Sequence, residues 1–242
     1  MTIHIIGDST ASIKLDEKRP EHGWGEFLHL FLMKDVQIMN YAKNGESTKS
    51  FKDRKLFLEA TKNFKKGDYL FIQFGHNDSK VIDPEKYTQP FGTYQANLKY
   101  FVDKANEHDV TPIIFSSISR RYFVSDKKLE KHTIGLYPKA AMWFAKNHDI
   151  KHIDMYTKTH KLYTYLTDDL SKRMFMHLLP NEHPNYPLGL IDNTHLKENG
   201  AKVIASLVAE SLYKSKQTKA FKHLVLKDQL YRKVDIKRQL NE

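Results

Sequence analysis

The clearest chemistry in the chain lies in the segment DNTH at 192–195, where a carboxylate stands three residues before a histidine. At this spacing Asp192 can accept a hydrogen bond from one ring nitrogen of His195. That bond fixes the tautomer and stabilises the imidazolium that forms when the other nitrogen takes a proton. A serine hydroxyl is a poor nucleophile without such a base. We therefore predict that Ser9, in the segment GDST at 7–10, is a nucleophile activated by His195.

Three short segments, GDST at 7–10, NGES at 44–47 and GHND at 75–78, place small or amide-bearing residues directly after predicted strands. Ligands bind outside the carboxyl ends of the strands in open α/β sheets. Small residues there let the backbone turn sharply and approach a ligand. Acyl transfer also needs hydrogen-bond donors aimed at the developing oxyanion. We expect the backbone N–H groups of Ser9 and Gly45 and the side-chain amide of Asn77 to supply them.

The elements that must position these residues alternate along the chain. Continuous apolar runs predict buried strands at 3–6, 36–41, 69–74, 110–116 and 150–154. Apolar residues at helical spacing predict helical segments at 24–32, 51–64, 93–108, 137–148, 156–173 and 198–213. Three prolines and a glycine predict a long ordered loop over 174–195. The alternation predicts an α/β fold of three layers, a parallel sheet with helices on both faces.

Composition excludes several classes of protein. The chain has 242 residues, of which 40% are hydrophobic and 28% charged, which is typical of globular proteins and excludes a disordered chain. No apolar run reaches the roughly 18 residues of a membrane span. The absence of cysteine excludes disulfides, thiolate zinc sites and a cysteine nucleophile. The start MTIHIIG lacks the features of a secretory signal, so we expect a cytoplasmic protein.

The last part of the chain differs from the rest. We predict one domain over 1–213, followed by a charged extension over 214–242 with leucines at loosely helical spacing. This extension is either an added packing helix or the contact of a homodimer. The whole chain carries a net charge of +10, which attracts polyanions such as nucleic acid, anionic lipid or an acidic polysaccharide.

The segments GDS at 7–9, NG at 44–45, GHND at 75–78 and DNTH at 192–195 together resemble the four blocks of the SGNH (GDSL-like) hydrolases. The resemblance extends from about residue 3 to about residue 212. The segments QFGHND at 73–78, NYP at 185–187 and NGA at 199–201 are similar to the rhamnogalacturonan acetylesterase branch.

This resemblance implies a flavodoxin-like sheet of about five strands in the order 2-1-3-4-5. It implies hydrolysis of acetyl esters on pectin-type sugars through an acyl-enzyme on the serine of the first block, which is Ser9 here. No cofactor is implied, and the substrate expected is an acetylated acidic oligosaccharide. The extension beyond 214 has no role in the family pattern.

Alternative interpretations of the same residues predict different functions. A lipase, thioesterase or phospholipase would share the machinery, although polar and basic loops favour a sugar over a lipid. A metal site could be drawn from His177, His183, His195 and Asp192, but their spacing matches no standard motif and we expect no metal. A non-catalytic polyanion-binding module would use the +10 charge. Since no nucleic-acid-binding motif is evident, we expect neither nucleic acid nor membrane as partner.

Overall fold

Five short segments of the chain form one parallel sheet in the computed structural model, which describes residues 1–241. The strands are β1 (Thr2–Gly7), β2 (Gln37–Asn40), β3 (Tyr69–Gln73), β4 (Thr111–Phe115) and β7 (Lys151–Ile153). Their order is β2-β1-β3-β4-β7, and β1 pairs in parallel with both β2 and β3. Since β7 is the fifth strand of this sheet, the predicted order 2-1-3-4-5 is confirmed.

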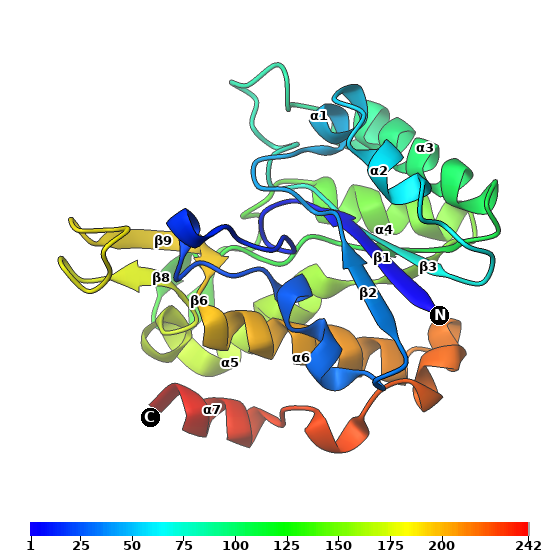
Figure 1. Ribbon diagram of the computed structural model, residues 1–242. Coiled ribbons are helices and arrows are strands. Elements are labelled where there is room, and N and C mark those ends of the chain that lie inside the picture. The colour runs from blue at the N-terminus through cyan, green and yellow to red at the C-terminus, as the bar shows by residue number, and fades with distance from the viewer. Residues whose placement is uncertain (242) are drawn as a thin grey trace.

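Helices cover both faces of the sheet, as Figure 1 shows. On one face lie α1 (Thr48–Asp53), α2 (Phe57–Thr61), η4 (Pro90–Tyr94), α3 (Gln95–Asn106) and α4 (Tyr137–Asn147). On the other lie α5 (Met155–Lys172) and α6 (Glu198–Lys214). Alternate residues of each strand enter the two cores: Ile6 and Ile72 pack with α1–α4, whereas Ile5 and Phe71 pack with α5 and α6. The predicted three-layer α/β architecture is therefore confirmed.

The segment after the first strand is less regular than its apolar spacing predicts. Residues 24–32 form two 3-10 turns, η2 (Trp24–Glu26) and η3 (Leu28–Phe31), instead of one helix. A Cβ atom on Gly25 would lie 2.4 Å from the carbonyl oxygen of Ala11, so this segment packs tightly against the backbone that follows Ser9. Residues 51–64 are likewise divided into α1 and α2 by a turn at Lys55, which has a φ of 58°.

The prediction of a long loop over 174–195 is wrong. This region is an antiparallel hairpin of β8 (Phe175–Leu178) and β9 (Leu190–Leu196). The three prolines all lie in the connection between the two strands. β9 carries the polar sequence DNTH and is only half-buried for most of its length, so no apolar run marked it as a strand. A second short hairpin, β5 (Phe123–Ser125) with β6 (Lys128–Leu129), also lacks a sequence signal.

The chain beyond Lys214 returns along α5 and α6 (Figure 1). It forms η5 (Lys216–His223), η6 (Lys227–Gln229) and α7 (Lys233–Asn241). Its buried apolar side chains belong to the same core as α5 and α6, and they are Phe221, Val225, Ile236 and Leu240. The domain boundary at 213 and a dimer contact through this extension stay predictions. Over residues 1–241, no helix combines the length and the apolar surface needed to cross a bilayer.

Candidate active site

The predicted nucleophile and base, 186 positions apart in sequence, meet at the carboxyl end of β1. Ser9 lies two residues after the end of β1, and its Oγ lies 2.9 Å from His195 Nε2. The other ring nitrogen of His195, Nδ1, lies 2.7 Å from Asp192 Oδ2. The hairpin strand β9 carries both Asp192 and His195. The three side chains thus form one continuous line of hydrogen bonds, with the geometry that a serine nucleophile needs.

Asp192 is held as an ionised acceptor. Its Oδ1 accepts hydrogen bonds from the backbone N–H groups of Thr194, at 2.6 Å, and His195, at 3.0 Å. Burial would raise the pKa of Asp192, but the hydrogen bonds and charge of His195 and the N–H of Thr194 outweigh burial and lower the pKa to about 2. Asp192 is therefore a carboxylate at any neutral pH, and it holds the Nδ1–H tautomer of His195.

The three predicted oxyanion donors lie on adjacent segments around Ser9. Gly45 has a φ of +78°, a conformation that favours glycine, and a Cβ there would meet no atom within 4 Å. Asn77 is buried, and its Nδ2 donates one hydrogen bond of 2.9 Å to the carbonyl oxygen of Glu46. That bond orients the amide, and within residues 1–241 its second N–H has no partner and is available to donate to a ligand.

A buried network of polar side chains fixes the turn that carries Ser9. Asp8 Oδ1 accepts from the backbone N–H and the hydroxyl of Thr10, and Asp8 Oδ2 lies 3.0 Å from His76 Nδ1. Gln73 Nε2 donates to the same Thr10 hydroxyl at 2.6 Å, and Gln73 Oε1 accepts from the Trp24 indole N–H at 2.9 Å. Burial would raise the pKa of Asp8, but the charge of His76 and the hydrogen bonds of His76 and Thr10 outweigh burial and lower it. Asp8 and His76 therefore stabilise the turn at Ser9.

Asp78 fixes the chain that follows Gly45 against the segment GHND at 75–78. Its carboxyl group accepts from the backbone N–H of Thr48 at 3.1 Å and from the Thr88 hydroxyl at 2.9 Å. Burial raises the pKa of Asp78 to about 7, although the hydrogen bonds of Thr48 and Thr88 oppose this rise. Because α1 begins at Thr48, three residues after Gly45, this contact sets the position of Gly45 relative to Asn77.

Several residues around the site escaped the sequence analysis. Arg121 is buried and holds β9, since its backbone N–H donates to Asn193 O at 2.8 Å and its Nη1 to Asn193 Oδ1 at 2.8 Å. Lys14 and Glu21 form a buried ion pair beside Ser9. Lysine, glutamate and arginine are rarely buried unless paired, so their types predict a solvated surface. Only long-range contacts identify them.

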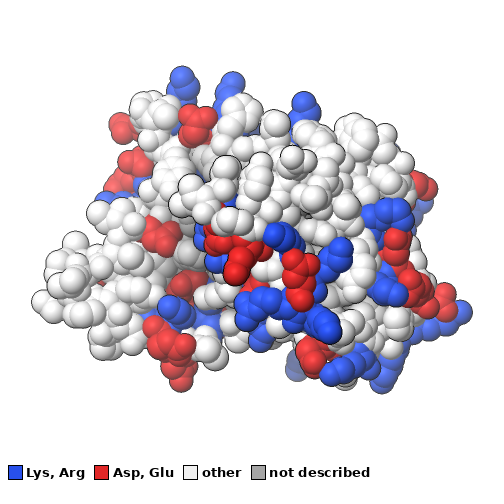
Figure 2. Space-filling model, turned by 90° about the horizontal axis from the view of Figure 1, so that it is seen from above, with Lys and Arg blue, Asp and Glu red and all other residues white. Residues whose placement is uncertain are grey.

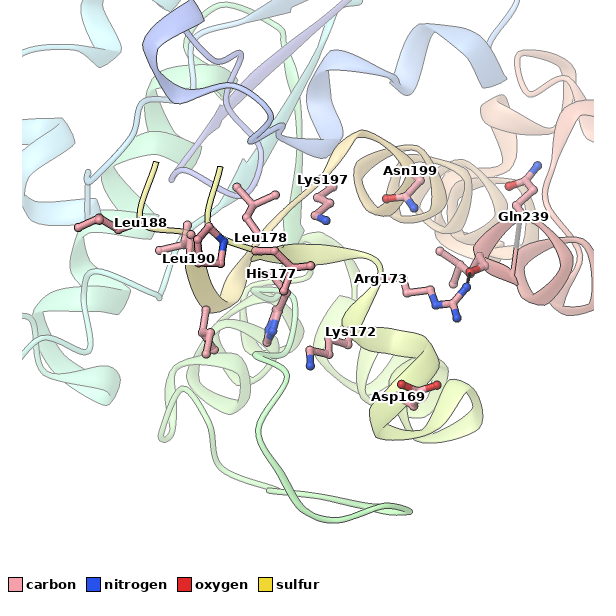
Figure 3. A pocket seen from close by; sticks show the side chains of 15 residues that line it. Asp169, Lys172, Arg173, His177, Leu178, Leu188, Leu190, Lys197, Asn199 and Gln239 are labelled. Carbon is pink, nitrogen blue, oxygen red and sulfur yellow. Dashed lines mark hydrogen bonds between the residues drawn. The ribbon is translucent and has the colours of Figure 1, made fainter. Parts of the chain in front are cut away.

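A pocket of about 960 Å³ opens on the far side of the hairpin, between β8, β9, the end of α5 and α7. Figure 3 shows Lys172, Arg173 and His177 among the side chains that line it. None of its lining residues is Ser9, Asp192 or His195. This pocket therefore does not include the hydrogen-bonded line of Ser9, His195 and Asp192.

The alternative functions, a metal site and a polyanion-binding surface, can be compared with the described residues. Within residues 1–241, no three histidine, aspartate or glutamate side chains are close enough to hold a metal ion. His177, one member of the alternative metal set, instead lies 2.9 Å from Asn193 Oδ1 through its Nε2. Figure 2 shows lysine and arginine interspersed with aspartate and glutamate on the face that it presents.

Comparisons with known proteins place the chain in a family. Residues 3–208 match the family described as GDSL-like Lipase/Acylhydrolase. The chain is 40% identical over 210 residues to rhamnogalacturonan acetylesterase RhgT of Bacillus subtilis (strain 168), covering 87% of this chain and 88% of that protein. It is 28% identical to the probable rhamnogalacturonan acetylesterase YesY of the same strain, covering 87% and 91%.

A similar solved structure is the crystal structure of protein YXIM from Bacillus subtilis. It has a TM-score of 0.74 and 20% identity, and the match covers 88% of this chain and 56% of that one. This likeness supports the fold. The family match and the 40% identical relative together show that the chain belongs to the GDSL-like lipase/acylhydrolase family and is a carboxylic ester hydrolase.

Proposed function

We propose that this protein is a serine esterase that removes O-acetyl groups from pectin-type rhamnogalacturonan oligosaccharides through an acyl-enzyme. The observation that carries the reaction is the hydrogen-bonded line from Ser9 Oγ through His195 to Asp192. The substrate class is supported by RhgT, which is 40% identical and named a rhamnogalacturonan acetylesterase. YesY, at 28% identity, is named a probable enzyme of the same kind.

The first half of the reaction forms the acyl-enzyme. Ser9 Oγ attacks the carbonyl carbon of the acetyl ester while His195 Nε2 takes the serine proton. Asp192 stabilises the resulting imidazolium from the Nδ1 side. The oxyanion accepts hydrogen bonds from the N–H groups of Ser9 and Gly45 and from the Asn77 amide. When the intermediate collapses, His195 returns its proton to the departing sugar hydroxyl and the acetyl group stays on Ser9.

The second half regenerates the free enzyme. A water molecule replaces the sugar, and His195 Nε2 takes its proton as the water oxygen attacks the acetyl carbon. The same donors hold the second oxyanion. Collapse releases acetate as His195 gives the proton back to Ser9 Oγ. The residues proposed for the reaction are thus Ser9, His195 and Asp192, with Gly45 and Asn77 as oxyanion donors.

Acyl-chain preference separates this proposal from a lipase or thioesterase on the same scaffold. We expect kcat/KM for p-nitrophenyl acetate to exceed that for the octanoyl ester by at least about tenfold, because a hydrophobic pocket gains about 1–3 kcal/mol for each methylene that it accommodates and an acetyl site has no such space. The measurement is the initial rate with acetyl, butanoyl and octanoyl esters. A preference for the octanoyl ester contradicts the sugar assignment.

Acetate release from the sugar itself tests the substrate class. Acetylated rhamnogalacturonan oligosaccharides and acetylated xylo-oligosaccharides are compared at equal acetyl concentration. We expect faster release from the rhamnogalacturonan material. Equal or faster release from the neutral xylo-oligosaccharides contradicts the preference for an acidic substrate while leaving the esterase assignment intact.

Asn77→Ala tests the oxyanion role. We expect kcat for p-nitrophenyl acetate to fall by about 10²–10³, with a smaller change in KM, because the amide is proposed to donate mainly in the transition state. Asn63→Ala is a matched control, since Asn63 is exposed and its amide donates to the backbone carbonyl oxygen of Glu59, away from Ser9. An Asn77→Ala enzyme with unchanged kcat would remove Asn77 from the mechanism.

A further inference from the structure

A lysine and a glutamate lie buried beside the proposed nucleophile, although neither belongs to the four family segments. Lys14 Nζ lies 2.7 Å from Glu21 Oε1, and the two side chains are 0% and 9% exposed. Burial lowers the pKa of Lys14, and the charge of Glu21 opposes that change. Replacing a buried ion pair by apolar residues is often neutral or stabilising, so such a pair is weak support for a stability role. Its position points to a role in the reaction.

Lys14 connects the segment that carries Ser9 with the segment that carries Gly45. Its Nζ donates to the backbone carbonyl oxygen of Ser9, to Asn44 Oδ1 at 2.7 Å and to Ser12 Oγ at 3.0 Å. Ser12 Oγ also donates to Asn44 Oδ1, at 2.6 Å. Asn44 directly precedes Gly45. One ammonium group thus fixes the turn that carries Ser9 relative to the backbone that is proposed to hold the oxyanion.

Glu21 faces the ring nitrogen that exchanges the proton. Its Oε1 lies 3.8 Å from His195 Nε2. Apart from the ion pair with Lys14, this oxygen has no hydrogen-bond donor within residues 1–241. The backbone around Glu21 is fixed on both sides: His22 N donates to Leu196 O at 2.8 Å, and Trp24 N donates to Thr10 O at 2.9 Å. The carboxylate is therefore held between β9 and the nucleophile segment.

We propose that Glu21 is a second carboxylate for His195, which stabilises the imidazolium from the Nε2 side as Asp192 does from the Nδ1 side. Lys14 holds Glu21 in place. Its positive charge also partly offsets the attraction of the Glu21 carboxylate for the His195 imidazolium, so that His195 can still lose its proton. Both are positioning residues, because they act through His195 and Ser9. This inference rests on the proposed function, since it assumes that His195 takes the proton of Ser9.

Other charged and titratable groups also surround this pair and the base. Arg19, His22 and Glu26 form a neighbouring cluster, with Arg19 Nη1 at 3.0 Å and His22 Nδ1 at 3.3 Å from Glu26 Oε2. The groups that face His195 or the pair are Asp192 from β9, Tyr186 from the hairpin connection, Asp8 below Ser9, and Glu26 from η2. None of these residues is itself altered in a variant that changes only Lys14 or Glu21.

The two single variants should displace the pH profile in opposite directions. In Glu21→Gln, the imidazolium loses a carboxylate and faces an unpaired ammonium, so we expect the acidic limb of kcat/KM to move to lower pH by about one unit. In Lys14→Met, the full charge of Glu21 acts on His195, and we expect the limb to move to higher pH by about one unit. We expect kcat at the optimum to fall about tenfold to hundredfold in each.

A double variant separates this role from a structural one. Removing one partner leaves a buried charge and destabilises the fold, whereas removing both relieves it. We therefore expect Lys14→Met/Glu21→Gln to melt at a higher temperature than either single variant while its kcat stays at least about tenfold below wild type. The exposed pair Lys99–Asp103 on α3 gives charge-matched controls, Lys99→Met and Asp103→Asn, with wild-type profiles expected.

The outcomes distinguish this inference from the proposed function. If Ser9→Ala is inactive but the acidic limb of both single variants coincides with wild type, only the role of the pair is overturned. Recovery of full kcat together with stability in the double variant also overturns it. If Ser9→Ala is active, the proposed function itself fails, whatever the behaviour of Lys14 and Glu21.

Discussion

We expect Ser9→Ala to lower kcat for p-nitrophenyl acetate by about 10⁴–10⁶ while the protein stays folded. The loss is large because the hydroxyl forms the covalent bond of the proposed mechanism, and no other group replaces it. The stability cost is small, since within residues 1–241 the only hydrogen bond of Ser9 Oγ is to His195 Nε2, and that imidazole is 29% exposed and can bond to water. The measurements are steady-state kinetics and thermal unfolding of both proteins.

Covalent labelling strengthens this test. A serine-directed phosphonate should inactivate the wild-type enzyme and add one phosphonyl group at Ser9, which peptide mass spectrometry locates. Ser125→Ala, at an exposed position in β5, is the matched control and should be labelled and active like wild type. Near-wild-type activity in Ser9→Ala, or a phosphonyl group on another serine, would overturn the assignment of the nucleophile.

The residues of the candidate site could be proposed from the sequence because chemistry restricts such residues to few types at strand ends. Ser9, Gly45 and Asn77 each follow a strand whose apolar run is easily recognised, and parallel strands bring their carboxyl ends to one edge. Asp192 and His195 could be paired because their spacing is local. The sheet order needed the family resemblance, since periodicity does not determine which strands are neighbours.

The remaining features depend on contacts that no local pattern encodes. β9 is a half-buried polar strand whose pairing partner, β8, lies more than ten residues away, so hydrophobic periodicity could not identify it. Residues 24–32 have helical spacing but pack on the backbone after Ser9, where tertiary contact overrides propensity. Lys14 and Glu21 are of residue types that usually lie on a solvated surface, and their burial depends on their ion pair and on the hydrogen bonds that Lys14 donates to neighbouring segments.

Asp192→Asn should lower kcat/KM by about 10⁴ although its shape is nearly unchanged. A carboxylate only accepts hydrogen bonds, so it selects the Nδ1–H tautomer of His195 and leaves Nε2 free to take the proton of Ser9. An amide can present its NH₂ group to Nδ1 instead, which places the proton on Nε2 and disables the base. The variant also loses the charge that stabilises the imidazolium.

The same substitution has a signature in the pH dependence of stability. The pKa of Asp192 falls from 3.8 to about 2 on folding, so the folded state favours the ionised form. Its contribution is fully present above pH 3.8 and is lost as the pH falls through about 2. We therefore expect the melting temperature of Asp192→Asn to decrease less than that of wild type between pH 4 and 2.

The control for both measurements is Asp126→Asn, at an exposed position in the β5–β6 turn, which should match wild type in activity and in acid sensitivity.

The two measurements on Asp192→Asn are independent, because a tautomer change affects turnover at neutral pH and proton linkage affects unfolding in acid. If Asp192→Asn has the kcat/KM of wild type, His195 does not need Asp192 to hold its tautomer. An unchanged acid response would show that the carboxylate is not held ionised by the contacts with His195 and Thr194.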